Sequence, residues 1–295
     1  MEQVSAVLRA LRRPIRDHGS LESCRVLAWR LSDTVDVERV TLKLEDLLGS
    51  FVEAEAGRAA GAILLAEGSS RVAFSADDQL PGASVLKLPL VMALFDEAAR
   101  GHVDMRAPVK CSSLDETVYA SVLQAFEADD SLTISQLAGL ALMTSDNPSA
   151  SWLLRLVGAD VVNSWLRANG CSDTRIVASF SDSDLSVLGR QSVTTVGDCL
   201  TVLRLLDLEP RFARVRTWLE NNVRNSRIPA RLPDDLAIAH KTGSLDGVIN
   251  DVGIIPCPMG SIAVAFLTVD QQDPIVTSVD IADACLGVWR CLGGD

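Results

Sequence analysis

The chain has 295 residues, of which 48% are hydrophobic and 22% are charged, a composition typical of a folded protein with an ample core. Its 39 acidic and 27 basic residues give a net charge of −12. This charge argues against nucleic acid or an anionic membrane as a partner, because a phosphate backbone binds to a basic face.

Residues 1–36 form an extension to which the sequence assigns no role. Its start, residues 1–16, alternates arginines with apolar residues, which is typical of an amphipathic helix at a membrane surface, in an organelle address or on a protein surface. The extension has neither the apolar core nor the cleavage site of a signal peptide. We therefore expect a cytoplasmic protein without a membrane partner, whose extension packs on the domain or joins subunits of a homo-oligomer.

The first elements after the extension are a helix and two strands. Helical spacing of apolar residues predicts a helix over residues 40–52. Two apolar runs, residues 59–66 and 71–74, read as strands joined by a turn at 67–70. A Pro-Gly turn then precedes a helix that begins near Ser84 and stops at Gly101.

The middle of the chain is predicted to be largely helical. Thr133 and Gln136 form a capping-box pattern at the start of one helix. Asn147-Pro148 opens another, which Gly158 ends. Three more helices follow the same periodicity, over residues 160–168, 194–206 and 211–223.

Strands return near the end of the chain, at residues 236–240, 248–255 and 262–269, with a turn at 256–260 and a closing helix over 276–292. The order predicts an α+β fold in which an antiparallel sheet flanked by helices adjoins an all-helical lobe. The domain would span residues 37–295, with a sheet lobe at about 37–80 and 230–295 and a helical lobe at about 84–225. A cleft between two such lobes is a usual place for a small-molecule site.

Cysteine and histidine usage favours free thiols and no metal. Seven cysteines are scattered without a Cys-x-x-Cys pair, which suits a reducing compartment: Cys24, Cys111, Cys171, Cys199, Cys257, Cys285 and Cys291. The three histidines, His18, His102 and His240, have no second candidate ligand nearby. No Gly-rich phosphate loop is present, so we expect no cofactor. No apolar run approaches membrane-spanning length.

One short motif, Ser84-Val85-Leu86-Lys87, carries the first sign of chemistry. Residues three apart on a helix lie on one face, so the Lys87 amine can approach the Ser84 hydroxyl. A serine becomes a nucleophile when a neighbouring base takes its proton, and an amine with a lowered pKa can do so. Taken alone, the motif is more often a helix N-cap followed by a solvated lysine.

Two later triplets change that balance. Ser145-Asp146-Asn147 follows an apolar helical run, and Lys241-Thr242-Gly243 ends the strand-like run at residues 236–240. Taken alone, the first triplet would be a helix N-cap, and we expect Asp146 to have that role in any case. Taken alone, the second triplet would be a strand that ends in a turn. Ser-x-x-Lys, Ser-Asp-Asn and Lys-Thr-Gly in this order are the signature of class A β-lactamases and penicillin-binding proteins. From about Val40 to Leu292 the sequence resembles the class A β-lactamase-like serine hydrolases.

The resemblance implies four catalytic roles. Ser84 would attack a carbonyl and form an acyl-enzyme, with Lys87 as its base directly or through a water. Ser145 would relay a proton to the leaving group, while Lys241 lowers its pKa and attracts an anionic substrate. The oxyanion would be held by the backbone N–H groups of Ser84 and Ser244.

The resemblance also implies the substrate contacts. Asn147 would hydrogen-bond a substrate amide, and Thr242 and Ser244 would contact a carboxylate. Gly243 would let the substrate lie flat against a strand edge. Tyr119, the only tyrosine, completes the predicted substrate-binding set.

Two departures from the family pattern stand out. Class A enzymes hold a water-activating glutamate in an Ω-loop between the second and third motifs, but residues 176–186 contain none, and Asp182 or Asp184 would have to substitute. The strand after Lys-Thr-Gly carries residues 249–252, Ile-Asn-Asp-Val, where the family often has an arginine. Candidate replacements are the three nearby arginines Arg224, Arg227 and Arg231.

The sequence therefore predicts a serine acyl-enzyme hydrolase or acyltransferase that attacks a β-lactam or another activated amide or ester. Without the glutamate, fast hydrolysis is in question, which favours transfer of the acyl group to an amine in small-molecule biosynthesis. Two further alternatives are a D-Ala-D-Ala carboxypeptidase-like peptidase and a ligand-binding protein that acylates without turnover.

Overall fold

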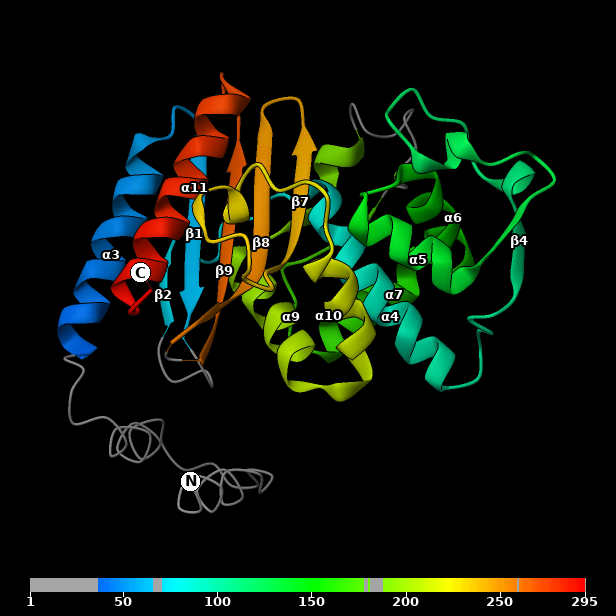
Figure 1. Cartoon of the computed structure of the whole chain (residues 1–295), viewed down its shortest axis with the longest axis horizontal. Helices are drawn as coiled ribbons and strands as arrows, with labels where there is room; N and C mark the ends of the chain where they lie inside the picture. The colour runs from blue at the N-terminus through cyan, green and yellow to red at the C-terminus, as the bar shows by residue number, and fades with distance from the viewer. Residues whose placement is uncertain (1–36, 66–70, 178–179, 181–187, 259, 295) are drawn as a thin grey trace, which may run out of the picture. The chain divides into compact units, whose positions relative to one another are not determined.

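A five-stranded antiparallel sheet is the centre of the described structure, a computed structural model that describes residues 37–65, 71–177, 180, 188–258 and 260–294 (Figure 1). Its strand order is β2-β1-β9-β8-β7. The strands are β1 (Arg58–Leu64), β2 (Arg71–Phe74), β7 (Ala239–Leu245), β8 (Val248–Cys257) and β9 (Gly260–Val269). Both halves of the chain contribute, because β1 pairs with β9, and β7 is left as an edge strand.

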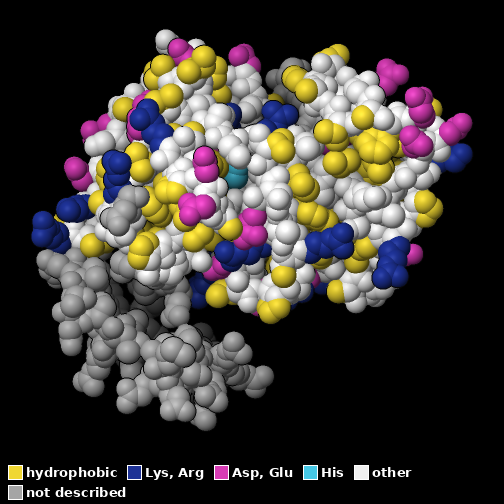
Figure 2. Space-filling view, in the orientation of Figure 1, with side chains coloured by type: hydrophobic (Ala, Val, Ile, Leu, Met, Phe, Trp, Pro, Cys, Tyr) yellow, Lys and Arg dark blue, Asp and Glu magenta, His cyan; other side chains and the backbone are white. Residues whose placement is uncertain are grey.

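Helices α3 (Val37–Ala54) and α11 (Pro274–Cys291) cover one face of the sheet (Figure 1). On this face Phe51 packs edge-on against Phe266, with ring centroids 5.0 Å apart. Ala60 and Ala62 on β1 point to the opposite core while Ile63 points to this one, as the period of two in a strand requires. Charged side chains of both signs lie over the outer surfaces of α3 and α11 (Figure 2), so each helix buries one apolar stripe.

The other face supports a helical region in which α4 (Lys87–Ala99) is buried for most of its length. Around it lie α5 (Ile134–Met143), α6 (Asn147–Val157), α7 (Ala159–Ala168), α9 (Val196–Leu208) and α10 (Ala213–Glu220). The Thr133–Gln136 capping box forms as predicted, and Gly158 ends α6 with φ of 89°. Two short antiparallel pairs, β3 (Leu80–Pro81) with β6 (Val193–Thr194) and β4 (Pro108–Lys110) with β5 (Ser131–Thr133), were not predicted.

The fold class is as predicted, but the placement of the Lys-Thr-Gly triplet at the end of a strand was wrong. Lys241 lies inside β7, which begins at Ala239 and continues to Leu245. The strand continues because Leu245 pairs with Val248 across the two-residue turn Asp246-Gly247, in which Gly247 has φ of 65°. The Lys-Thr-Gly triplet therefore lies inside one strand of a β-hairpin, with strand residues both before and after it.

Several predictions fall outside the described residues: those for residues 1–36, for the turn at 67–70, and for Asp182 and Asp184. Six of the seven cysteines are described, and five of these are free thiols: Cys111, Cys171, Cys199, Cys285 and Cys291. Within the described ranges, no helix combines the length and apolar character needed to cross a membrane.

Candidate active site

The turn that carries Ser84 is a short 3₁₀ segment, Ala83–Leu86, directly before α4. Ala83 has φ of 47°, a left-handed conformation that costs a residue with a Cβ about 1 kcal/mol or more. Two long-range hydrogen bonds hold the chain there: Asn250 Nδ2 donates to Pro81 O at 2.8 Å and Gly82 N donates to Ser192 O at 2.9 Å. The half-buried Ser84 is thus presented on a strained turn fixed by β8.

Lys87, at the first position of α4, is completely buried. Its Nζ donates to Ser145 O at 2.7 Å and to Asn147 Oδ1 at 2.6 Å, and lies 3.4 Å from Ser145 Oγ. The first two motifs therefore meet, and the solvated-lysine alternative is excluded by burial.

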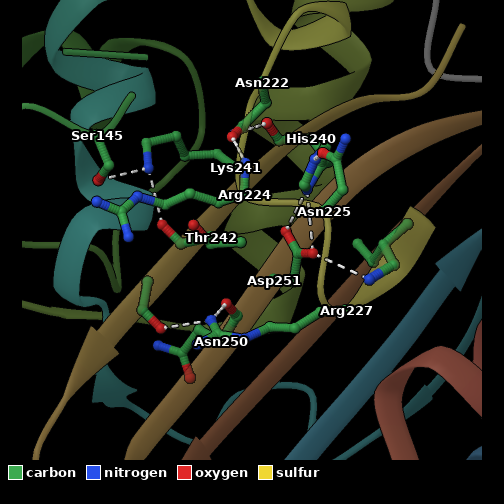
Figure 3. Close-up of polar contacts among 12 residues, drawn as sticks. Ser145, Asn222, Arg224, Asn225, Arg227, His240, Lys241, Thr242, Asn250 and Asp251 are labelled. Carbon is green, nitrogen blue, oxygen red and sulfur yellow. Dashed lines mark hydrogen bonds and ion pairs between the residues drawn. The ribbon is translucent and has the colours of Figure 1, made fainter. Parts of the chain in front are cut away.

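Ser145 lies between the two lysines of the site. Lys241 Nζ donates to Ser145 Oγ at 2.9 Å and to Thr242 O at 2.8 Å, so the third motif joins the other two (Figure 3). Ser145 has φ of 60°, a second left-handed residue at the site. The following residue, Asp146, caps α6 by accepting from Ser149 N at 2.8 Å, as predicted.

Burial shifts the pKa of both lysines in the direction that a base requires. Desolvation lowers the pKa of Lys87 from 10.5 to about 7, with Asp146 opposing the shift and Arg224 adding to it. Desolvation and the neighbouring Lys87 lower the pKa of Lys241 well below its usual value. A neutral Lys87 is therefore populated near neutral pH.

Strand β7 brings its open edge against the Ser84 turn. A Cβ on Gly243 would lie 2.9 Å from Gly82 O and 3.2 Å from the Cβ of Ala83, so only glycine allows this approach. The predicted oxyanion donors, the N–H groups of Ser84 and Ser244, are thus carried by two segments in direct contact.

Arg227 supports β7 from behind. It is 7% exposed, and its Nη1 donates to Gly243 O at 2.9 Å and also to Asn250 O, while Nη2 donates to Ser244 Oγ at 2.6 Å. The negative charge of the fully buried Asp251 raises the Arg227 pKa, against a larger lowering by burial. Arg227 therefore acts through Ser244, because both of its terminal amines already donate inside the protein.

The carboxylate of Asp251 has further partners. Both of its oxygens lie 3.1 Å from His240 Nδ1, and Ile228 N donates to one of them at 3.1 Å (Figure 3). His240 is consequently a buried structural residue beside Lys241. No cluster of three or more His, Cys, Asp or Glu side chains suited to a metal ion occurs in the described ranges.

Two of the predicted candidates lie apart from this cluster. Tyr119 is 55% exposed, and the contact of its loop with the site is a hydrogen bond that Ser121 donates to Asp146. Arg231 pairs with Asp283 of α11 at 2.8 Å, and so its guanidinium is engaged away from the site. Of the three arginines considered, Arg224 and Arg227 are the two that reach it.

A residue that the sequence did not flag covers Lys87. The ring centroid of Phe180, a side chain only 5% exposed, lies 5.3 Å from Lys87 Nζ. Phe180 belongs to the segment in which the family glutamate was sought. Among the described residues this segment therefore offers Lys87 an aromatic face and no carboxylate.

A serine on a strained turn, a buried amine of lowered pKa and a second serine between two lysines define a serine hydrolase site of the β-lactamase type. The comparison with known families agrees: residues 42–289 match the model of the Beta-lactamase enzyme family, and the chain belongs to this family. The resemblance drawn from the three motifs is thereby confirmed.

Individual relatives show how distant the relationship is. The chain is 24% identical to Beta-lactamase VEB-1 of Pseudomonas aeruginosa over 86% of this chain and 90% of that protein. It is 28% identical to Beta-lactamase AST-1 of Nocardia asteroides over 82% of each. A solved ancestral class A β-lactamase aligns with TM-score 0.75 at 25% identity, covering 83% of this chain and 98% of its own. The TLA-1 extended-spectrum β-lactamase aligns with TM-score 0.78 at 21% identity, covering 85% and 99%, which confirms the fold.

Proposed function

We propose that this chain forms an acyl-enzyme on Ser84 from a β-lactam or another activated amide or ester, with Lys87 as the base. In the first step the Ser84 Oγ–H proton passes to the Lys87 amine while Oγ bonds to the substrate carbonyl carbon. General-base assistance of this kind contributes about 10²–10⁴-fold. The resulting oxyanion accepts hydrogen bonds from the N–H groups of Ser84 and Ser244.

The bonding of Lys87 carries this proposal. A neutral amine has two N–H donors and one lone pair. The two short hydrogen bonds, to Ser145 O and Asn147 Oδ1, use both donors and leave the lone pair to accept a proton. A pKa of about 7 makes this neutral form available near neutral pH.

The second step breaks the bond to the leaving group. Ser145 Oγ gives its proton to the departing nitrogen or oxygen and recovers one from a lysine that faces it. Lys241 at 2.9 Å and Lys87 at 3.4 Å are both placed for this transfer. The acyl group then remains on Ser84 as an ester.

Transfer of that acyl group to an amine is the second candidate function, and Phe180 is the observation that favours it. Hydrolysis needs a base that activates water, whereas an amine attacks an ester without a dedicated carboxylate. The Phe180 ring over Lys87 places an apolar surface beside the base. We therefore expect slow hydrolysis and an acyl-enzyme that persists until an acceptor arrives.

Intact-mass spectrometry during reaction with a chromogenic cephalosporin tests the proposal. We expect a covalent adduct on the parent protein and on a Ser278→Ala control, which changes a serine on α11, and none on Ser84→Ala. Rapid colour change without an adduct would identify a fast β-lactamase and refute slow hydrolysis. A long-lived adduct that added amines release would support transfer, whereas one that amines leave in place would indicate a binding protein.

Absence of both adduct and colour change would refute the β-lactam as substrate. Activated aryl esters and acyl-D-Ala-D-Ala peptides would then be compared in the same assay, again with Ser84→Ala. Cleavage of the peptide alone would favour the carboxypeptidase alternative.

A further inference from the structure

Hydrogen bonds join the segment Asn222–Arg227 to strand β7 (Figure 3). Asn222 Nδ2 donates to His240 O at 2.9 Å, and its Oδ1 accepts from Arg224 N at 2.9 Å. Asn225 Oδ1 lies 3.1 Å from His240 Nε2. The residues before and after Arg224 are thus held by the buried His240, which fixes the position of the Arg224 backbone.

The guanidinium of Arg224 reaches across to the helical region. Its Nε donates to Thr144 O at 3.1 Å, next to Ser145, and Figure 3 shows the guanidinium beside Ser145 and Lys241. Arg224 also contributes to lowering the pKa of Lys87, of Lys241 and of Arg227, as a nearby positive charge must.

Arg224 differs from the other cations of the site in having donors to spare. Lys87 and Lys241 are completely buried and hydrogen-bonded, and Arg227 spends both terminal amines on the protein. Arg224 is exposed, and its Nη1 and Nη2 make no hydrogen bond or ion pair with any residue that the structure describes. Two parallel N–H donors on an exposed guanidinium form the fork that binds a carboxylate.

The position of Arg224 indicates which part of the substrate it meets. It lies beside Ser145, the residue proposed to protonate the leaving group, because its Nε donates to Thr144 O (Figure 3). Ser244 lies two residues beyond Thr242 along β7, where Arg227 Nη2 donates to its hydroxyl. The site therefore offers two separate positive positions toward the departing half of the substrate. A single carboxylate at Thr242 and Ser244 leaves the Arg224 fork unused.

We propose that Arg224 binds a second carboxylate, and that the preferred acyl donor is one whose leaving half is a dianion. This inference rests on the proposed acyl-enzyme chemistry for its activity readout, and on binding alone for its second readout.

Matched aryl esters test the activity. The probes are the 3-carboxyphenyl and 3,5-dicarboxyphenyl esters of N-phenylacetylglycine, whose leaving phenols carry one and two carboxylates. For the parent protein we expect kcat/KM to favour the dicarboxylate roughly tenfold, equivalent to about 1.4 kcal/mol. Arg224→Gln should abolish this preference, and Arg224→Lys, which keeps the charge without the fork, should retain part of it.

Arg231→Gln is the matched control, because Arg231 is a nearby arginine that pairs with Asp283 instead. It should leave the ratio of the two esters unchanged. No dicarboxylate preference in the parent, or a preference that survives in Arg224→Gln, would overturn the proposal.

Binding to the Ser84→Ala variant separates this proposal from the proposed function. We would measure the dissociation constants of 3-hydroxybenzoate and 5-hydroxyisophthalate by NMR titration, where no turnover is needed. Tighter binding of the dicarboxylate that Arg224→Gln removes supports the proposal even if neither ester is cleaved through Ser84. Equal binding of the two anions would refute it, whatever the activity.

Discussion

Replacement of Lys87 by methionine should make the protein more stable while it removes the catalytic base. Methionine fills a similar volume with a flexible apolar chain, so the buried space stays occupied. The pKa of Lys87 falls from 10.5 to about 7 on folding, which corresponds to about 5 kcal/mol of destabilisation at low pH. The substitution also leaves Ser145 O and Asn147 Oδ1 without this donor, at about 1 kcal/mol each because both residues are half-buried. We therefore expect a net gain of about 3 kcal/mol at about pH 6.

The gain must depend on pH with a definite sign. The folded pKa of Lys87 lies below the unfolded one, so between about 7 and 10.5 the unfolded chain binds the extra proton. The destabilisation is complete below about pH 7 and disappears as the pH rises toward 10.5. By about pH 9 some 3 kcal/mol of it is gone, and the Lys87→Met variant should be about as stable as the parent.

Urea unfolding at about pH 6 and about pH 9 measures both numbers, and stopped-flow acylation measures the activity. Lys110→Met, at an exposed position on β4, is the control and should change stability by no more than about 0.5 kcal/mol at either pH. Acylation of Lys87→Met should fall by about 10²–10⁴-fold. A variant that is less stable at about pH 6, or a gain that does not shrink with pH, would refute the desolvated, near-neutral lysine.

Three further outcomes follow from the same geometry. Asp146→Ala should lower stability by about 1–2 kcal/mol through loss of the α6 cap, measured by thermal melting. It should also move the pH midpoint of acylation downward, because the Asp146 charge raises the Lys87 pKa. Arg227→Gln should lower stability by about 3 kcal/mol in urea, because the carbonyls of Gly243 and Asn250 lose a buried donor. Gly243→Ala should slow acylation about 10²–10³-fold with the fold retained by circular dichroism, because the added methyl pushes β7 from the Ser84 turn.

Local sequence signals were sufficient for most of the fold. The capping box at Thr133, the Asp146 cap and Gly158 each act within a few residues, so each was visible in the sequence and is present in the structure. The error at Lys241 had a local signal too, because Asp246-Gly247 is a strong two-residue hairpin turn that places the triplet inside the strand.

The long-range hydrogen bonds that hold the site could not be predicted from local sequence patterns. Asn250 reaches Pro81 across 169 positions of sequence, and no periodicity links two such residues. One hint was available: Asn250 and Asp251 interrupt the otherwise apolar run of β8, and buried polar side chains need partners. The sequence could thus indicate that these residues bind something, but not that Asn250 holds the nucleophile turn.

The two departures from the family pattern differ in their consequences. In the strand after Lys-Thr-Gly, residues 249–252 lack the arginine that is frequent in the family, yet the Arg227 guanidinium donates to Asn250 O of the same strand and to Ser244 Oγ. The positive charge is therefore supplied from another position of the chain and is not lost. At the segment before Val193, by contrast, Phe180 faces Lys87, and an aromatic ring cannot accept a proton from water. We therefore expect the first departure to leave recognition of an anionic substrate intact, and the second to decide whether the proposed acyl-enzyme is hydrolysed or transferred.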